Sequence, residues 1–188
     1  MPILGIFASS ITPSLQNSYE SISTVTVGAG GSSTISFTSI PATYTHLQLR
    51  AIAACNQPST DFRPSLQINS DTGANYANHQ IYFDGASAPS QGFASSTVID
   101  RLGYMPGSSS LANTFATFIM DFLDYSNTSK YKTIRFLNGH EENSAGKYSA
   151  YASGLWMNTN AISTLTFTIA GGGNFIQNTQ FALYGIKG

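Results

Sequence analysis

His140-Glu141-Glu142 is the densest group of side chains in this sequence that could bind a metal or act as acid and base. The run follows Asn138-Gly139, a pair typical of tight turns, so we expect it at an exposed loop tip. A metal site would need further ligands, for which His46 and His79 are the available nitrogen donors. His46 alternates in phase with Gln48, which places it on the solvent side of a strand. We predict neither a metal nor another cofactor.

Two further groups could do chemistry, but their surroundings are unfavourable. Asp121 and Asp124 lie three residues apart in an extended segment, so their carboxylates point to opposite faces. They are a poor fit to the close carboxylate pair of a retaining glycosidase. Cys55 is the only cysteine and stands beside two alanines, with no adjacent basic residue to lower its thiol pKa. We interpret Cys55 as a small buried hydrophobic residue.

Asp71-Thr72-Gly73-Ala74 spells the active-site loop of aspartic proteases. That chemistry needs two Asp carboxylates that share one proton. The chain holds no second copy of the loop, although a second chain could supply it. An aspartic-protease-like hydrolase that uses Asp71 is therefore a remote alternative. The simpler interpretation is a hairpin turn, in which Asp71 caps its own backbone and Gly73 has a positive φ. We expect that the protein is not an enzyme.

Aromatic side chains set among Asn and Gln could stack on sugar rings, and the chain holds 10 Tyr and 1 Trp. Tyr76, Tyr82, Tyr104 and Trp156 are our candidates for contact with a glycan or a partner protein. The competing interpretation places the same residues in a sandwich core or a subunit interface, which use the same aromatic residues.

Charged residues are scarce: they make up 9% of the 188 residues, against about 25% in an ordinary soluble domain. The 8 Lys and Arg residues are scattered, which excludes a basic surface for nucleic acid. A hydrophobic share of 41% excludes disorder, and the shortage of Glu and Lys excludes a coiled coil. No apolar run reaches the length of a membrane span, and the first basic residue is Arg50, unlike an export signal. We expect a soluble protein with no nucleic-acid or membrane partner.

Hydrophobic residues alternate with period two along most of the chain, which predicts β-strands. Leu165, Phe167 and Ile169 alternate with threonines, and Leu47 stands in a similar pattern. Phe115–Leu123 is apolar on both faces, so we expect a central strand that is buried on both sides. Further runs of this kind cover residues 34–38, 131–138, 148–156 and 180–186.

Turn signals separate these runs about every 10–15 residues, which fits an antiparallel sandwich or barrel. The signals are Gly28–Gly31, Asp71–Gly73, Asp84-Gly85, Asn138-Gly139 and Gly171–Gly173. Residues 86–96 and 106–110 are rich in Ser, Ala, Gly and Pro, which predicts long loops. Within residues 93–105 we expect a short helix or an irregular crossover. We predict a single β-sandwich domain over residues 18–188, preceded by an extended N-terminal arm over residues 1–17.

Four stretches combine moderately specific motifs with glycine turns, in order from one end of the chain to the other. They are Leu4–Ile11 with Tyr19–Gly31, Ile35–Arg50, Asn69–Tyr76, and Ile162–Phe167 with Gly172–Phe175 and Phe181–Lys187. The Ile-Pro-x-x-Tyr-x-x-Leu motif that begins at Ile40 and the Leu-Tyr-Gly-Ile motif at Leu183 are the most specific parts. Together these stretches resemble the structural proteins of tailed-bacteriophage virions, while residues 86–107 match less clearly.

The resemblance implies a jelly-roll-like antiparallel β-sandwich and a non-catalytic place in the virion, as a homo-oligomer and often a trimer. Capsid decoration or cement proteins and the tips of tail fibres are the two possible places. A single domain without a heptad shaft or a β-helical repeat favours the capsid surface. We therefore predict a protein made in the host cytoplasm that binds and stabilises the shell, with the major capsid protein or another virion protein as partner. The alternative is a tail-fibre or receptor-binding tip that contacts host surface glycans.

Three structural expectations accompany this prediction. Pro41 would stand at the start of a strand, where its missing backbone donor costs little. Gly185 would stand late in the final strand, where another backbone approaches closely. The low charge predicts a broad, mostly uncharged contact with the shell, which loses little affinity as the salt concentration rises.

Overall fold

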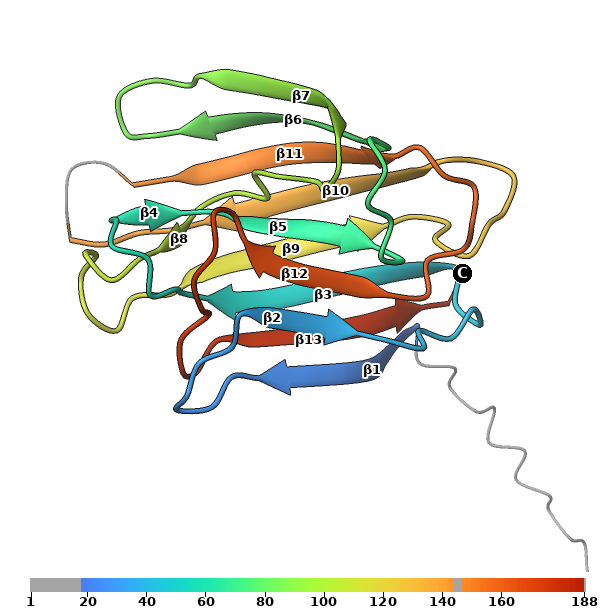
Figure 1. The fold of residues 1–188 in the computed structure, drawn as a ribbon, viewed down its shortest axis with the longest axis horizontal. Helices are drawn as coiled ribbons and strands as arrows, with labels where there is room; N and C mark the ends of the chain where they lie inside the picture. The colour runs from blue at the N-terminus through green and yellow to red at the C-terminus, as the bar shows by residue number, and fades with distance from the viewer. Residues whose placement is uncertain (1–17, 144–146, 188) are drawn as a thin grey trace, which may run out of the picture.

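The computed structural model of the chain describes residues 18–143 and 147–187, which form β-strands and connecting loops but no helix. The strands in these residues pair in antiparallel fashion and pack as two layers (Figure 1). The predicted all-β antiparallel sandwich is therefore confirmed. The predicted N-terminal arm, residues 1–17, lies outside the described residues.

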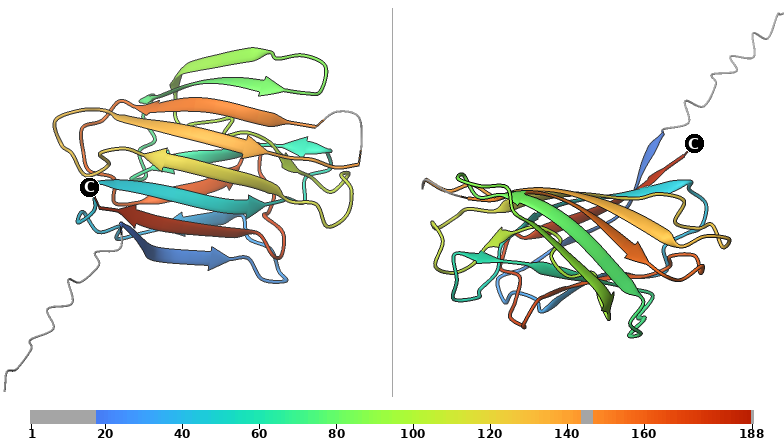
Figure 2. Two further views of the ribbon diagram at one scale, coloured as in Figure 1. Left: turned by 180° about the vertical axis from the view of Figure 1, so that it is seen from behind. Right: turned by 90° about the horizontal axis from the view of Figure 1, so that it is seen from above.

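One layer is a large sheet of eight strands in the order β1-β13-β3-β9-β10-β11-β6-β7. Their bounds are β1 (Tyr19–Thr26), β3 (His46–Ala53), β6 (Tyr76–Phe83), β7 (Ser90–Ser96), β9 (Ala116–Phe122), β10 (Lys132–Gly139), β11 (Ser149–Trp156) and β13 (Gln180–Ile186). The strands β1 and β7 form the two edges of this sheet, as the view from behind shows (Figure 2, left).

The other layer is a small sheet of three strands in the order β2-β12-β5. Its strands are β2 (Thr34–Phe37), β5 (Pro64–Ile68) and β12 (Leu165–Ile169), and a short pair joins β4 (Asp61–Phe62) to β8 (Met105–Pro106). The view from above shows the small sheet on one side of the large sheet only (Figure 2, right). The opposite side, here called the outer face, has no second layer of described residues over it.

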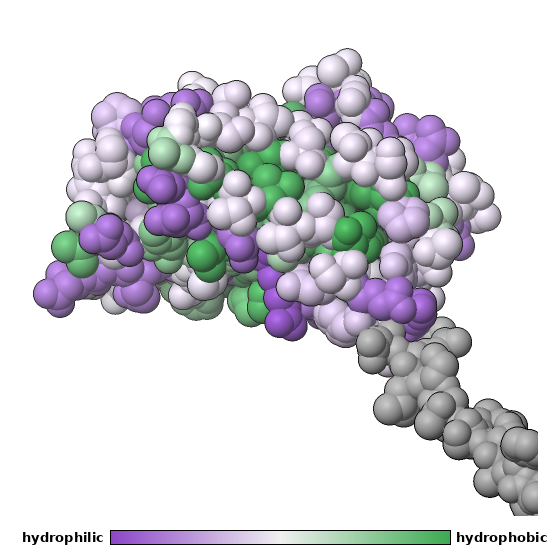
Figure 3. All heavy atoms as spheres, turned by 90° about the horizontal axis from the view of Figure 1, so that it is seen from below, coloured by the Kyte–Doolittle hydropathy of each residue, from purple (hydrophilic) through white to green (hydrophobic). Residues whose placement is uncertain are grey.

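The core lies between the two layers, where the alternating hydrophobic residues meet. Leu165, Phe167 and Ile169 of β12 are buried, as is Leu47 of β3. The predicted alternation, in which these hydrophobic residues share the buried face of their strand, is therefore confirmed. The rings of Phe167 and Phe181, one from each layer, have centroids 5.0 Å apart. Each such side chain stabilises the fold by about 1.5–3 kcal/mol when it is fully buried. From the β1 edge, hydrophobic residues form a band along the middle of the molecule (Figure 3).

The strand predicted over residues 115–123 is central but is not buried on both sides. β9 lies between β3 and β10, and Phe118, Met120 and Phe122 point into the core. Its other face carries the exposed side chains Thr117 and Ile119. The reason is that the small sheet covers only the inner face of the large sheet, so an apolar outer face remains uncovered.

Two predicted hairpin turns connect the two layers instead. Residues 28–31 lead from β1 in the large sheet to β2 in the small sheet, and residues 71–73 lie on the path from β5 to β6. The positive φ angles of the second connection fall on Asn69 (51°) and Ser70 (55°) rather than on Gly73. Gly and Asp allow the chain to reverse its direction, but they do not decide with which strand the following segment pairs. Asp84-Gly85 does form a hairpin turn, and Gly85 has φ 88°.

Three other local predictions are also wrong. The strand predicted over residues 131–138 is confirmed as β10, but the turn predicted at Asn138-Gly139 is wrong because both residues belong to that strand. Ser90–Ser96 forms the edge strand β7, although residues 86–96 read as a loop. Pro41 lies in the connection between β2 and β3 and does not start a strand. The segment between β7 and β8 is an irregular crossover, one of the two predicted forms.

The sandwich is unequal, because eight strands in one layer face three in the other. A jelly roll divides eight strands between two sheets. The jelly-roll part of the expectation therefore rests on the sequence resemblance alone.

Candidate functional site

The predicted protease residue Asp71 is a hydrogen-bond acceptor that ties the β5–β6 connection to the large sheet. Its Oδ2 accepts from Trp156 Nε1 at 2.8 Å, and its Oδ1 accepts from the backbone N of Gly73 at 2.8 Å. Asn75 Nδ2 lies 3.0 Å from Oδ2 and 3.2 Å from Oδ1. The bonds from Trp156, Asn75 and Gly73 lower the pKa of Asp71 from its usual value. This environment favours a fixed carboxylate rather than one that shares a proton.

The aromatic residues predicted to contact a glycan or a partner are mostly in the core. Tyr76 is 0% exposed, Trp156 1% and Tyr104 7%, so none of the three offers a ring face to a ligand. The Tyr76 hydroxyl donates to the carbonyl of Ile68 at 3.1 Å, which satisfies its polar group inside the protein. Tyr82 is partly buried and packs on Tyr104 with ring centroids 5.3 Å apart. The structure assigns these rings to internal packing.

The His140-Glu141-Glu142 run lies in the loop after β10, where Glu141 is exposed, but His140 is only 1% exposed. Its Nδ1 lies 3.3 Å from Asp61 Oδ1, and burial lowers the pKa of the imidazole. Lys147 forms ion pairs with both Asp61 and Glu142, so an ammonium group occupies the space among the acids. Within residues 18–143 and 147–187, no group of three or more His, Cys, Asp or Glu side chains is arranged to hold a metal. His140 and Glu142 belong to a buried ion-pair cluster with Asp61 and Lys147, whereas Glu141 is exposed.

Exposed hydrophobic residues concentrate on the outer face of the large sheet. Ten large hydrophobic side chains of the described residues are exposed, and seven of them lie on this face. The seven are Tyr19, Ile52, Ile81, Phe83, Ile119, Leu137 and Tyr151. Scattered single hydrophobic residues need no explanation on a protein surface, but a gathering of this size makes the outer face a candidate interaction site.

Strand register aligns four of these residues into what we call the apolar row. Ile119 of β9 stands opposite Leu137 of β10, Leu137 opposite Tyr151 of β11, and Tyr151 opposite Ile81 of β6. Arg50 of β3 continues the row on its other end. All four side chains are exposed. The row crosses the middle of the sheet at right angles to the strands.

A polar row runs beside the apolar row, two residues away along each strand. It consists of Gln48, Asp121, Arg135, Ser153 and His79, which stand opposite one another in that order. Asp121 accepts from Gln48 Nε2 at 2.8 Å and from Arg135 Nη2 at 2.6 Å. The hydrogen bond with Asp121 raises the pKa of Arg135. The charged groups of the polar row therefore satisfy one another.

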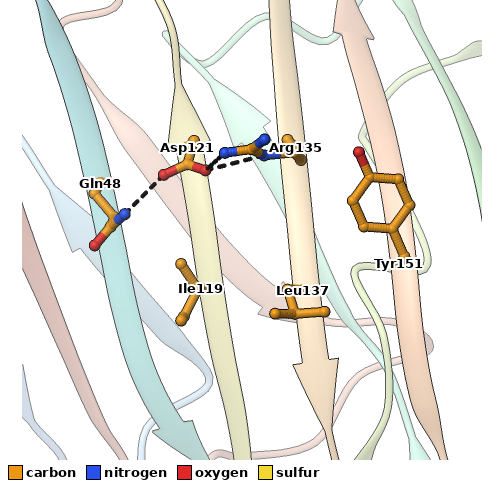
Figure 4. Close-up of a pocket in the computed structure, with 6 residues that line it drawn as sticks. All are labelled: Gln48, Ile119, Asp121, Arg135, Leu137 and Tyr151. Atoms are coloured by element: carbon orange, nitrogen blue, oxygen red, sulfur yellow. Dashed lines mark hydrogen bonds and ion pairs between the residues drawn. The ribbon is translucent and has the colours of Figure 1, made fainter.

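Side chains of both rows enclose a shallow hollow on the outer face, and Figure 4 shows them pointing to the same side of the sheet. A second hollow lies on the other side of Ile119 and Leu137, over Thr117, Gly139 and Ser149. Gly139 contributes to this depression because it has no side chain. The apolar row is thus a low ridge between two hollows.

Partial signals of this face are present in the sequence. The apolar residues of 115–123 pointed in both directions, and Ile119 was among them. Tyr151 was not singled out, because it alternates with small residues and resembles any exposed Tyr. His46 and His79, the two nitrogen donors considered for a metal site, lie on the outer face, on β3 and β6.

Comparison of the chain with models of known protein families, with curated proteins and with solved structures found no match. In the part of the chain that the structure describes, no helix is long and apolar enough to span a membrane. The candidate site is accordingly defined by its geometry: a broad outer sheet face with an apolar centre.

Proposed function

We propose that this protein is a non-catalytic structural subunit of a tailed-bacteriophage virion, namely a capsid decoration protein that stabilises the shell by packing against other subunits. The observation that carries the packing role is the outer face, on which seven of the ten exposed large hydrophobic residues gather. The resemblance of four sequence stretches to virion proteins supports a location in the bacteriophage particle. The major capsid protein or another virion protein is the expected partner.

The chemistry of the described residues supports packing rather than turnover. Asp71 is an acceptor of structural hydrogen bonds, and the His140 cluster is filled by the Lys147 ammonium group. The outer face carries few charges, and Asp121 already bonds Arg135 and Gln48. Covering such a face buries few charged groups without a partner, and the desolvation cost of the contact is therefore low.

Cryo-electron microscopy of the intact particle that carries this protein tests the proposal. Density that fits the eleven-strand, two-layer sandwich on the capsid surface is the expected result. A salt series on purified particles adds a second measurement, because an uncharged contact is little affected by screening. The protein should stay bound from 0.1 to about 1 M NaCl, over which the Debye length falls from about 10 to 3 Å. Its absence from the particle, or release by moderate salt, would contradict the proposal.

Tyr151 favours a second candidate function, that of a tail-fibre or receptor-binding tip. Its half-exposed ring stands beside Arg135 and Asp121, and an aromatic face next to hydrogen-bonding groups is suited to a sugar ring. A glycan array probed with the wild type and with Tyr151→Ala measures glycan binding and the contribution of this ring to it. Specific binding that Tyr151→Ala abolishes, together with density only at the tail tip, would favour the tip over the capsid.

A further inference from the structure

We propose that the apolar row is the centre of a face-to-face contact between two copies of this chain. The inference rests on the proposed function in one respect, because it names a partner for the same outer face. It adds the identity of that partner, the symmetry of the contact and the residues at its centre.

The area of the outer face matches what a stable contact between two subunits needs. Eight strands about 4.8 Å apart give a width of about 34 Å, and strands of seven or eight residues are about 25 Å long. The face therefore covers roughly 850 Å², close to the roughly 800 Å² that each partner contributes to a standard interface. Its apolar row lies at the centre and the polar row beside it, the arrangement found in protein interfaces.

The face is complementary to itself under a two-fold rotation. Two copies related by an axis along the apolar row would bring that row onto its counterpart, with Leu137 near the axis. The same rotation places the polar row over the residues on the other side of the ridge. On β10 this sets Arg135 of one copy over Gly139 of the other, and on β9 it sets Asp121 over Thr117.

The small residues of the second hollow make this arrangement sterically possible. Gly139 and Ser149 leave the depression beside Leu137, and a long side chain such as Arg135 would fill it. Within the polar row charge does not oppose the contact, because Asp121 lies between Arg135 and Gln48 in each copy. The same axis sets Arg50 over Arg50 of the other copy, a like-charge pair at the end of the apolar row. The cation left without a carboxylate in this group is Arg50, which bonds Gln48 Oε1 at 2.9 Å and lies over the Tyr19 ring.

The molar mass in solution tests the proposal directly. Sedimentation equilibrium of the wild-type chain should give twice the chain mass of 20.0 kDa. Leu137→Arg places a charge at the centre of the contact and should weaken the dimer at least 100-fold. Leu111→Arg is the matched control, because Leu111 is equally exposed (55% against 54%) but lies in a loop outside the large sheet. The control should remain a dimer, and circular dichroism should show that both variants are folded.

Crosslinking tests the symmetry without introducing a charge. Facing sheets lie about 10 Å apart, beyond the reach of a direct disulfide, so a bismaleimide that spans about 8 Å is the suitable reagent. Leu137→Cys should yield a crosslinked dimer at low micromolar protein, whereas Leu111→Cys should not. Cys55 is 2% exposed and burial raises its thiol pKa, so it gives no background product.

The outcomes separate this inference from the proposed function. A monomeric wild-type chain would overturn the inference. This holds whether the apolar row is then uncovered, covered by residues 1–17 or bound to another protein. A trimer in which Leu137→Cys does not crosslink would also overturn it. If such a chain still binds the capsid, the proposed function stands. A dimer that Leu137→Arg dissociates, in a protein absent from the particle, would support the inference and overturn the proposed function.

Discussion

Trp156 donates its indole N–H to the carboxylate of Asp71 at 2.8 Å, and this bond joins the large sheet to the connection that arrives from the small sheet. Both residues were candidates for function, Asp71 for hydrolysis and Trp156 for ligand contact. Their pairing explains both in structural terms, because the buried indole needs an acceptor and the carboxylate needs donors.

Trp156→Phe removes this donor and should destabilise the fold by about 2 kcal/mol at pH 7, the typical value of a hydrogen bond to a charged group. The pKa of Asp71 is lowered in the folded state, so the bond stabilises the fold above the unfolded pKa of about 3.9. That stabilisation is lost as the pH falls through the lower folded pKa. Urea unfolding at pH 7 and near pH 3 measures the difference, which should narrow in acid. Tyr151→Phe, an exposed aromatic control, should change little, and an equal gap at both pH values would contradict this account.

His140→Gln should flatten the pH dependence of stability just below neutrality. Burial lowers the pKa of His140, so the unfolded chain takes up a proton near pH 6.5 whereas the folded protein does not. The wild type should therefore lose stability as the pH falls below 6.5, by at most about 1.4 kcal/mol per pH unit. Unfolding free energies at pH 7.5 and 5.5 test this. The exposed His79→Gln control should keep the slope, and a wild-type slope of zero would refute the prediction.

Lys147→Met should destabilise the protein by about 3 kcal/mol, because it leaves Asp61 and Glu142 close together without a cation. The Lys147 side chain is only 6% exposed, so solvent cannot replace the ammonium group. Lys130→Met is the matched control: it breaks an ion pair with Asp124 that is exposed on both sides and should cost little. Thermal unfolding of the two variants provides the comparison. Equal effects would show that burial does not set the strength of these pairs.

Gly185→Ala should destabilise the fold by about 1–3 kcal/mol through overpacking. A Cβ at this position would lie 2.4 Å from carbons of the Tyr44 ring, whose hydroxyl donates to Glu20 Oε2 at 3.0 Å. The close approach expected at Gly185 is thus made by an aromatic ring rather than by another backbone. Gly28→Ala, with no atom within 4 Å of its added Cβ, should change stability by less than about 0.5 kcal/mol. Chemical denaturation of both variants checks the difference.

The sequence by itself determined the strand content and the parity of most strands. Leu165, Phe167 and Ile169 point into the core because alternation at period two follows directly from strand geometry. Burial of Cys55 was also predictable, since its neighbours are small and uncharged. The scarcity of charge does not predict the exposed hydrophobic residues, such as Ile119 and Leu137, that gather on the outer face.

Only the tertiary structure decided which faces are covered and which residues meet. Asn138 continues a strand because its amide bonds the backbone of Tyr104, a partner 34 residues away that no local turn propensity reveals. The four residues of the apolar row come from four strands, and register alone brings Leu137 beside Ile119 and Tyr151. Alternation shows that a strand has two faces, but pairing between distant segments decides which face a second layer buries.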